Sequence, residues 1–199
     1  MYPTFFDAMA ARADARWRAA EEVGAVVLVA ALTAIAAQIS IPLPFTPVPF
    51  TLQPMVVLVS AAALGARRGA ASQILYLALG IAGLPVFAAS PILPQGVLRL
   101  AGPTGGYLMS YPFAAFVAGW LAERGFDRRY GTFVIAMACG LAVVFAGGVL
   151  WLAAGAPARG LSAALAAGFY PFIAADVVKL LVAAGAMPGL WRYLPNTTM

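Results

Sequence analysis

The chain has 199 residues, of which 63% are hydrophobic and only 10% are charged, whereas a soluble domain of this size carries about 25% charged residues. Its mean hydropathy of +0.92 excludes an ordinary soluble domain and predicts an all-α integral membrane protein. The net charge of +5 does not indicate a nucleic-acid partner, because the basic residues stand between apolar stretches, where they set membrane topology.

The first 22 residues are rich in charge and are predicted to form a separate N-terminal cytoplasmic segment. They contain acidic residues and arginines, and no apolar run precedes a cleavage site, so a cleavable signal peptide is excluded. Residues 5–20 are predicted to form an amphipathic helix on the membrane surface. The remainder, residues 23–199, is predicted to be one membrane domain.

About six membrane-spanning helices fit into this domain, because each needs about 20 mostly apolar residues. The predicted spans are residues 23–41, 55–66, 70–87, 107–122, 132–154 and 165–187. The second span is short, and it crosses fully only if it borrows residues from the segment before it. Pro188 and Gly189 are predicted to end the last helix.

A Pro-rich segment, residues 41–54, separates the first two predicted spans. Its five prolines remove N–H donors and forbid a regular helix over much of its length. Irregular backbone survives at membrane depth only where it is buried in protein or lines a cavity. The segment is therefore predicted to be an outer loop or part of the roof of a pocket. Within it, Thr51 and Gln53 either bind a ligand or cap the second span.

The distribution of arginines predicts the orientation in the membrane. With six spans and an inside N-terminus, the outer loops hold Arg99 and Arg159. The cytoplasmic segments then hold Arg12, Arg16, Arg18, Arg67, Arg68, Arg124, Arg128, Arg129 and Arg192. Nine arginines against two is a strong positive-inside bias, which places both termini in the cytoplasm.

The sequence lacks the residues that several kinds of chemistry require. The chain has no histidine, which is the commonest general base and metal ligand, and it has no cluster of metal ligands. It also lacks the G-x-x-x-x-G-K-[ST] pattern of a P-loop, so it does not bind ATP in that way. Cys139, the single cysteine, is predicted to be a buried structural thiol. The sequence predicts a protein that is not an enzyme and needs neither a metal nor a cofactor.

Two charges inside the last span are the main functional signal. Asp176 and Lys179 are three residues apart and therefore share one helix face. Each charge costs about 2.5–3.5 kcal/mol at the centre of a membrane, so such residues usually face a cavity or the interior of a helix bundle. Their place in the outer half of the span predicts a binding site that opens outward. The alternative is a purely structural ion pair.

Three weaker signals accompany this pair. Arg99 is the single charge in the long loop before the fourth span, where it either folds over the site and binds a carboxylate or is a loop charge bound by solvent or lipid headgroups. Residues 102–106 (Gly-Pro-Thr-Gly-Gly) permit a close backbone approach at the start of that span. Ala30 and Ala34 form a small-residue face on the first span, which is a candidate docking face for a partner.

Four stretches of the chain, taken together, resemble one protein family. They are residues 49–53 (Pro-Phe-Thr-Leu-Gln), residues 75–87, residues 102–108, and Pro171-Phe172 followed by Asp176 and Lys179. They resemble the BioY family, the biotin-specific substrate-binding (S) components of energy-coupling factor (ECF) transporters. The resemblance departs from the pattern at residues 174–175, where Ala-Ala stands in place of the expected Pro-Gly.

The resemblance implies a six-helix S-component fold in the bacterial cytoplasmic membrane, with a pocket for biotin that faces outward. It also implies a transmembrane coupling protein and two ATPase subunits as partners, with docking at Ala30 and Ala34. Asp176 would accept the ureido N–H groups of biotin, and Lys179 and Arg99 would bind its valerate carboxylate. Thr51, Gln53 and Tyr107 would form the walls.

The sequence thus predicts a biotin-binding membrane subunit for vitamin uptake. One alternative is a stand-alone secondary transporter of a small organic anion. Another is an intramembrane scaffold or enzyme subunit, in which Asp176 and Lys179 only hold helices together.

Overall fold

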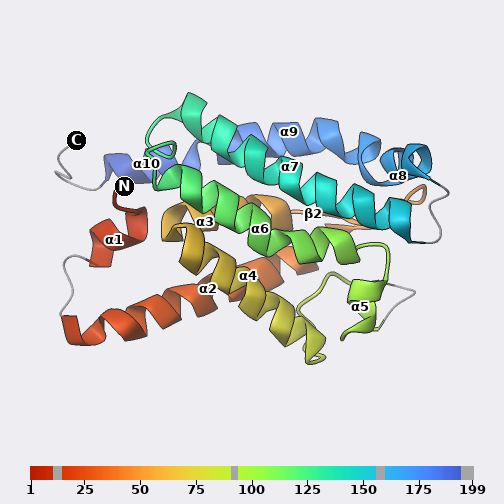
Figure 1. Ribbon diagram of the computed structural model, residues 1–199, viewed down its shortest axis with the longest axis horizontal. Coiled ribbons are helices and arrows are strands. Elements are labelled where there is room, and N and C mark those ends of the chain that lie inside the picture. The colour runs from red at the N-terminus through yellow and green to blue at the C-terminus, as the bar shows by residue number, and fades with distance from the viewer. Residues whose placement is uncertain (11–14, 91–93, 156–159, 194–199) are drawn as a thin grey trace.

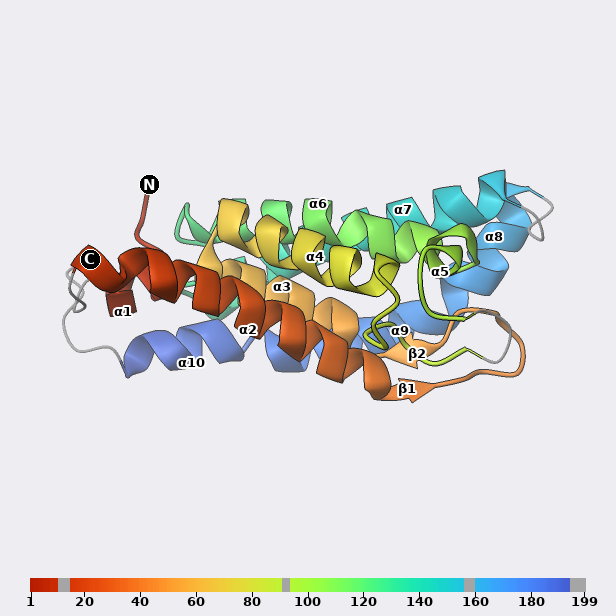
Figure 2. The same cartoon turned by 90° about the horizontal axis from the view of Figure 1, so that it is seen from below.

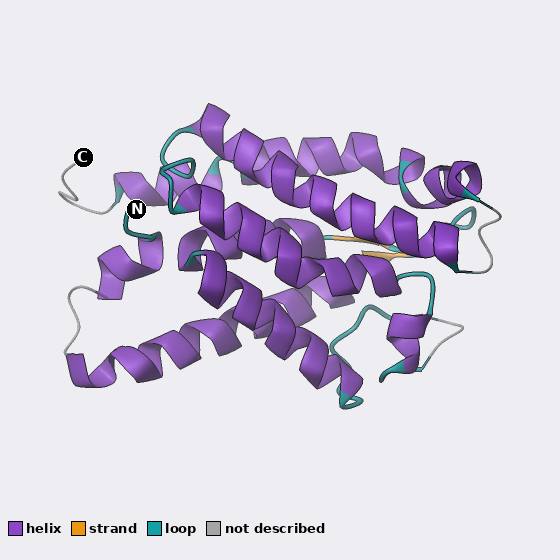
Figure 3. Cartoon of the chain, viewed as in Figure 1, coloured by secondary structure: helices purple, strands orange, loops and turns teal. Residues whose placement is uncertain are grey.

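The computed structural model describes residues 1–10, 15–90, 94–155 and 160–193, and most of them are helical. The helices are α1 (Phe5–Ala10), a 3-10 turn η1 (Ala15–Trp17), α2 (Arg18–Gln38), α3 (Gln53–Leu64), α4 (Ala66–Ile81), α5 (Leu98–Ala101), α6 (Gly105–Ala122), α7 (Tyr130–Ala154), α8 (Leu161–Gly168), α9 (Tyr170–Ala183) and α10 (Ala186–Arg192). Two short antiparallel strands, β1 (Ser40–Ile41) and β2 (Phe50–Thr51), pair across the Pro-rich segment. Figure 3 shows these strands amid long helices that run roughly along one axis (Figure 1).

Helix α3 lies at the centre of the helix bundle. It contacts α1, α2, α4, α6, α7, α9 and α10, and in Figure 2 it runs between the layer of α4 and α6 and the layer of α2 and α10. Val57, Leu58, Ala61 and Ala62 are almost completely buried. A helix that is apolar all round belongs in such a surrounded position.

Small residues allow the helices around α3 to approach closely. A Cβ atom at Gly119 of α6 would lie 2.5 Å from the backbone nitrogen of Ala66, and one at Gly69 of α4 would lie 2.8 Å from the Cβ of Ala61. Such contacts between backbones are how helices associate in a membrane, where apolar side chains gain little from leaving lipid. Glycine at these two positions therefore sets how near α6 and α3 lie to α4.

The outer surface of the bundle is apolar. Large exposed hydrophobic side chains include Leu28 and Ile35 on α2, Leu150 on α7 and Val182 on α9. Cys139 of α7 is also exposed, so the prediction of a buried thiol is wrong. An apolar exterior around a packed interior is the pattern of a protein whose surroundings are lipid.

Three segments of the described chain are long and apolar enough to cross a membrane: Arg18–Gln38, Tyr130–Ala154 and Tyr170–Arg192. The other predicted spans form helices that are shorter or less apolar. Helix α3 has 12 residues, or about 18 Å at 1.5 Å per residue. It takes Gln53 and Pro54 from the Pro-rich segment, and it is still shorter than the hydrocarbon core of about 30 Å. Helix α4 ends at Ile81, six residues before the predicted end.

The last predicted span is divided into three helices. A break at Phe169 separates α8 from α9, and residues 184–185 separate α9 from α10. Pro188 and Gly189 lie inside α10, so the prediction that they end the helix is wrong. Pro188 is tolerated because it lies in the first turn, where a backbone N–H has no helical acceptor.

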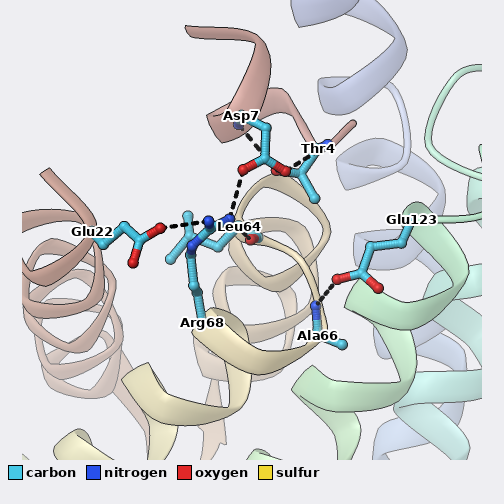
Figure 4. A network of polar contacts seen from close by, with 7 residues as sticks. All are labelled: Thr4, Asp7, Glu22, Leu64, Ala66, Arg68 and Glu123. Carbon is cyan, nitrogen blue, oxygen red and sulfur yellow. Dashed lines mark hydrogen bonds and ion pairs between the residues drawn. The ribbon is translucent and has the colours of Figure 1, made fainter. Parts of the chain in front are cut away.

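The end of the bundle where α1 and α10 lie is tied together by charged groups, and we call it the terminal end (Figures 1 and 4). Arg68 of α4 donates to Asp7 at 2.8 Å and to Glu22 at 2.7 Å. Thr4 and Asp7 exchange hydrogen bonds at the start of α1. Glu123 accepts the first backbone N–H of α4 at 2.8 Å. The N-terminal segment is thus bonded to the body of the molecule. Residues 11–14 of the predicted surface helix lie outside the described residues. Arg159, which was assigned to an outer loop, lies outside them as well.

Candidate ligand-binding site

A cavity of about 220 Å³ lies among the Pro-rich segment, the loop after α4, and helices α5, α6, α7 and α9. Because one water molecule occupies about 30 Å³ of the liquid, this volume suits a small organic molecule rather than an isolated water. The six side chains predicted to bind substrate all line it: Thr51, Gln53, Arg99, Tyr107, Asp176 and Lys179. The fold therefore brings together residues that are up to 128 positions apart in the chain.

Asp176 and Lys179 form an ion pair in the wall of the cavity. Asp176 is only 5% exposed, and its Oδ1 has no hydrogen-bond donor within the described chain beyond the contact with the Lys179 ammonium. A carboxylate can accept several hydrogen bonds. The pair therefore leaves acceptor capacity on a carboxylate of the cavity wall, which a ligand with N–H groups can use.

Lys179 is fixed by two further contacts. Its Nζ donates to the backbone oxygen of Thr51 at 2.8 Å and lies 3.8 Å from the centre of the Phe50 ring. An ammonium group has three donors, and an aromatic face attracts a cation. The amine is thus held between α9 and the Pro-rich segment, with Asp176 beside it.

Arg99 is buried beside the cavity. It lies in α5, is 4% exposed, and donates a hydrogen bond to the backbone oxygen of Ala88. The alternative of a solvated loop charge is therefore wrong. A guanidinium presents five donors in a planar fork, so Arg99 supplies the cavity with a positive group suited to a carboxylate.

Gln53 connects the Pro-rich segment to the loop after α4 through Tyr76. Gln53 Nε2 donates to the Tyr76 hydroxyl at 2.7 Å, and that hydroxyl donates to the backbone oxygen of Val86 at 3.2 Å. The Tyr76 ring packs edge-to-face on Phe87, with 5.5 Å between centroids. Gln53 is thus buried in a chain of hydrogen bonds. The predicted alternative of a helix cap fails, since no side chain caps α3; Thr51 instead contributes its backbone oxygen, which accepts from Lys179.

Aromatic rings complete the walls, and most of them were not among the predicted site residues. They include the rings of Phe87, Tyr111, Phe145 and Phe172, and Thr46 lines the cavity as well. Isolated aromatic residues in apolar helices look like ordinary core residues, so no local pattern marks them. The site joins flat apolar walls to a carboxylate and two cations, and it therefore suits a ligand with an apolar body, N–H donors and an anionic group.

The predicted docking face is closed in this structure. Ala30 is 1% exposed and packs in the core, and Ala34 is partly buried against it. Small side chains here let α2 approach its neighbours α3 and α4, both of which it contacts. The alanine face therefore packs within the chain, and Ala30 has no exposed surface on which a partner could dock.

The described residues contain no group of three or more histidine, cysteine, aspartate or glutamate side chains that could hold a metal ion.

Comparison with known proteins identifies the family of this chain. The model of the BioY family matches residues 9–196. The biotin transporter BioY of Thermotoga maritima is 41% identical over 154 residues, which is 77% of this chain and 86% of that protein. The probable biotin transporter BioY of Pyrococcus horikoshii is 40% identical over 164 residues, which is 82% of this chain and 92% of that protein.

The fold has a solved counterpart as well. The crystal structure of the S-component for biotin from an ECF-type ABC transporter superposes with a TM-score of 0.79 at 25% identity, over 90% of this chain and 95% of that one. The chain belongs to the BioY family.

Proposed function

We propose that this protein is the biotin-binding membrane subunit of an ECF-type vitamin uptake transporter. The observation that carries the proposal is the buried Asp176–Lys179 pair in the cavity wall, in a chain whose relatives are named as biotin transporters. The protein binds and delivers its substrate; it is not an enzyme, and biotin is its ligand rather than a cofactor.

The groups of the cavity match the groups of biotin. The ureido ring offers N–H donors, which suit the buried Asp176 carboxylate because an ionised carboxylate only accepts. The valerate carboxylate suits the Arg99 fork and the Lys179 ammonium through charge-assisted hydrogen bonds. The apolar bicyclic body and chain suit the aromatic walls. Thr51, Gln53 and Tyr107 shape the cavity around them.

We place the cavity on the outer side of the bacterial cytoplasmic membrane and the terminal end in the cytoplasm. The six crossing units are α2, α3, α4, α6, α7 and the sequence α8–α9–α10. The supporting observation is that arginines gather on elements of the terminal end, as the positive-inside rule expects of a cytoplasmic face. They are Arg16, Arg18, Arg67, Arg68, Arg124, Arg128, Arg129 and Arg192.

The chain has no P-loop pattern, so the proposal assigns ATP hydrolysis to partner subunits that act through a transmembrane coupling protein. The structural neighbour is the S-component of an ECF-type ABC transporter, which supports such an assembly. A stand-alone secondary transporter is not favoured, since the relatives and the structural neighbour are named for biotin transport.

Equilibrium binding to the purified protein tests the function. We expect biotin to bind tightly, its primary amide to bind more weakly because the anionic group is lost, and riboflavin and thiamine not to bind. Uptake in cells should stop when the ATPase subunits are deleted. Equal affinity for all of these vitamins, or no affinity for biotin, would contradict the proposal.

A further inference from the structure

The break between α8 and α9 leaves two backbone carbonyl groups without their helical partners. Pro171 has no N–H, so the carbonyl of Ala167, four residues earlier, loses its usual donor. The N–H of Phe172 bonds instead to Phe169 at 3.0 Å, which frees the carbonyl of Gly168 as well. Unpaired carbonyls at membrane depth are costly, because no bulk water is present to bond them.

Two side chains from distant elements donate to these carbonyls. Thr46 of the Pro-rich segment donates its hydroxyl to Ala167 at 2.6 Å. Tyr107 of α6 donates its hydroxyl to Gly168 at 2.7 Å. The partners are 121 and 61 positions apart in the chain, so both bonds exist only through the tertiary fold.

The packing around these bonds fixes their geometry. The Thr46 hydroxyl also accepts the backbone N–H of Val48 at 3.2 Å, which orients it. A Cβ atom on Gly148 of α7 or on Gly168 would overlap the Tyr107 side chain. The Tyr107 ring is thus held between α7 and the break, and its hydroxyl is directed at the carbonyl it satisfies.

The break determines where α9 begins, and α9 carries the charge pair. The same Pro-rich segment also holds the helix further along, through the bond from Lys179 to the Thr51 carbonyl. The two points of attachment, Ala167 and Lys179, lie on either side of Asp176 in the chain. They oppose rotation of α9, which would turn Asp176 away from the cavity, and sliding of α9, which would shift Asp176 along the cavity wall.

We propose that Thr46 and Tyr107 are positioning residues for biotin binding: by bonding the carbonyls of the α8–α9 break, they hold α9 where Asp176 faces the ligand. This inference rests on the proposed function. It assigns the Tyr107 hydroxyl to the protein backbone, whereas the ring still lines the cavity.

Three variants and a matched control test the inference by equilibrium binding and thermal unfolding. Thr46→Val keeps the shape and removes the hydroxyl, and Tyr107→Phe does the same for the phenol. We expect each to weaken biotin binding roughly tenfold, which is the scale of one lost hydrogen bond. Thr46→Ser keeps the donor and should restore affinity. Thr132→Val is the control, because Thr132 donates to backbone carbonyls of the α6–α7 turn, far from the cavity, and it should leave the affinity unchanged.

The action through Asp176 is tested by combining variants. If Thr46 positions Asp176, Thr46→Val should weaken binding much less in an Asp176→Asn background than in the native protein. Additive effects would overturn the inference, and so would native affinity in both Thr46→Val and Tyr107→Phe. Lack of biotin binding by the unmodified protein would instead refute the proposed function, which keeps the two failures distinct.

Discussion

Replacing Asp176 with asparagine separates the two roles of this carboxylate. The change keeps the shape of the side chain but removes its charge. Lys179, whose side chain is 15% exposed, then lacks a counter-ion. That cost falls mainly on the protein without ligand, because the carboxylate of bound biotin supplies Lys179 with a counter-ion, so it lowers stability rather than affinity. Breaking a fully buried pair costs about 3–5 kcal/mol, and here we expect less because Lys179 keeps the Thr51 carbonyl and the Phe50 ring.

The loss of affinity comes from the ligand's own hydrogen bonds. A bond to a charged group contributes about 1.5–3 kcal/mol, against about 1 kcal/mol for a neutral one, and the asparagine N–H₂ cannot accept a ureido N–H. We therefore expect Asp176→Asn to cost about 2 kcal/mol of binding free energy, which is roughly a 30-fold rise in Kd. Titration calorimetry on the protein in lipid nanodiscs measures this value directly.

Asp127→Asn is the matched control for this experiment. Asp127 is an equally buried acid, 1% exposed, but it lies at the terminal end, where it accepts a hydrogen bond from Trp191 at 2.6 Å. Its replacement should leave the Kd for biotin within about twofold. A Kd for Asp176→Asn as close to the native value as that of the control would refute the role of Asp176 in binding and restore the interpretation of a structural ion pair.

Three further predictions concern other parts of the chain. Arg99→Lys replaces the planar fork with a point charge and should weaken binding of biotin about tenfold while changing the affinity for its primary amide little; equal losses for both ligands would contradict a contact with the carboxylate. Gly119→Ala should lower stability by about 1–3 kcal/mol through overpacking, whereas Gly24→Ala, where nothing lies within 4 Å of the new Cβ, should raise it by about 0.5–1 kcal/mol; thermal unfolding in detergent compares the two, and the same sign for both would be inconsistent with the close contact of α6 and α4. Burial raises the pKa of Asp7, but hydrogen bonds from Thr4 and the ion pair with Arg68 outweigh it, so its pKa is lowered from 3.8. Its contribution to stability is therefore present above about pH 4 and is lost as the pH falls through the lowered pKa. Asp7→Asn should lower the free energy of unfolding by about 0.5 kcal/mol at pH 7 in low salt and leave it unchanged at pH 2. A difference in stability between the variant and the native protein that persists at pH 2 would argue against the ion pair.

Much of the candidate site could be predicted because its strongest signals are local. Asp176 and Lys179 stand out as charges in an apolar span, and a spacing of three residues places them on one helix face whatever the rest of the fold does. The prolines of residues 41–54 forbid a regular helix over much of that length and so indicated an outer loop or part of the roof of a pocket. The arginines between spans are likewise visible in the linear sequence, although Arg12 and Arg159 lie outside the described residues.

Other features depend on contacts between distant segments, which local patterns do not contain. Whether Ala30 faces a partner or the core, and whether Arg99 is solvated or buried, depends on which surfaces the helices present to one another. The division of the last span was missed because Pro188 looks like a helix end, while the actual breaks fall at Phe169 and at residues 184–185.

Composition and short-range spacing are enough to place this chain in a membrane and to mark the charges whose exposure to lipid would cost most. Where those charges point depends on how the helices pack against one another. The hydroxyl groups of Thr46 and Tyr107 compensate the carbonyls of a helix break far away in the chain, and a hydrogen bond between such distant residues is a property of the packed bundle rather than of any segment within it.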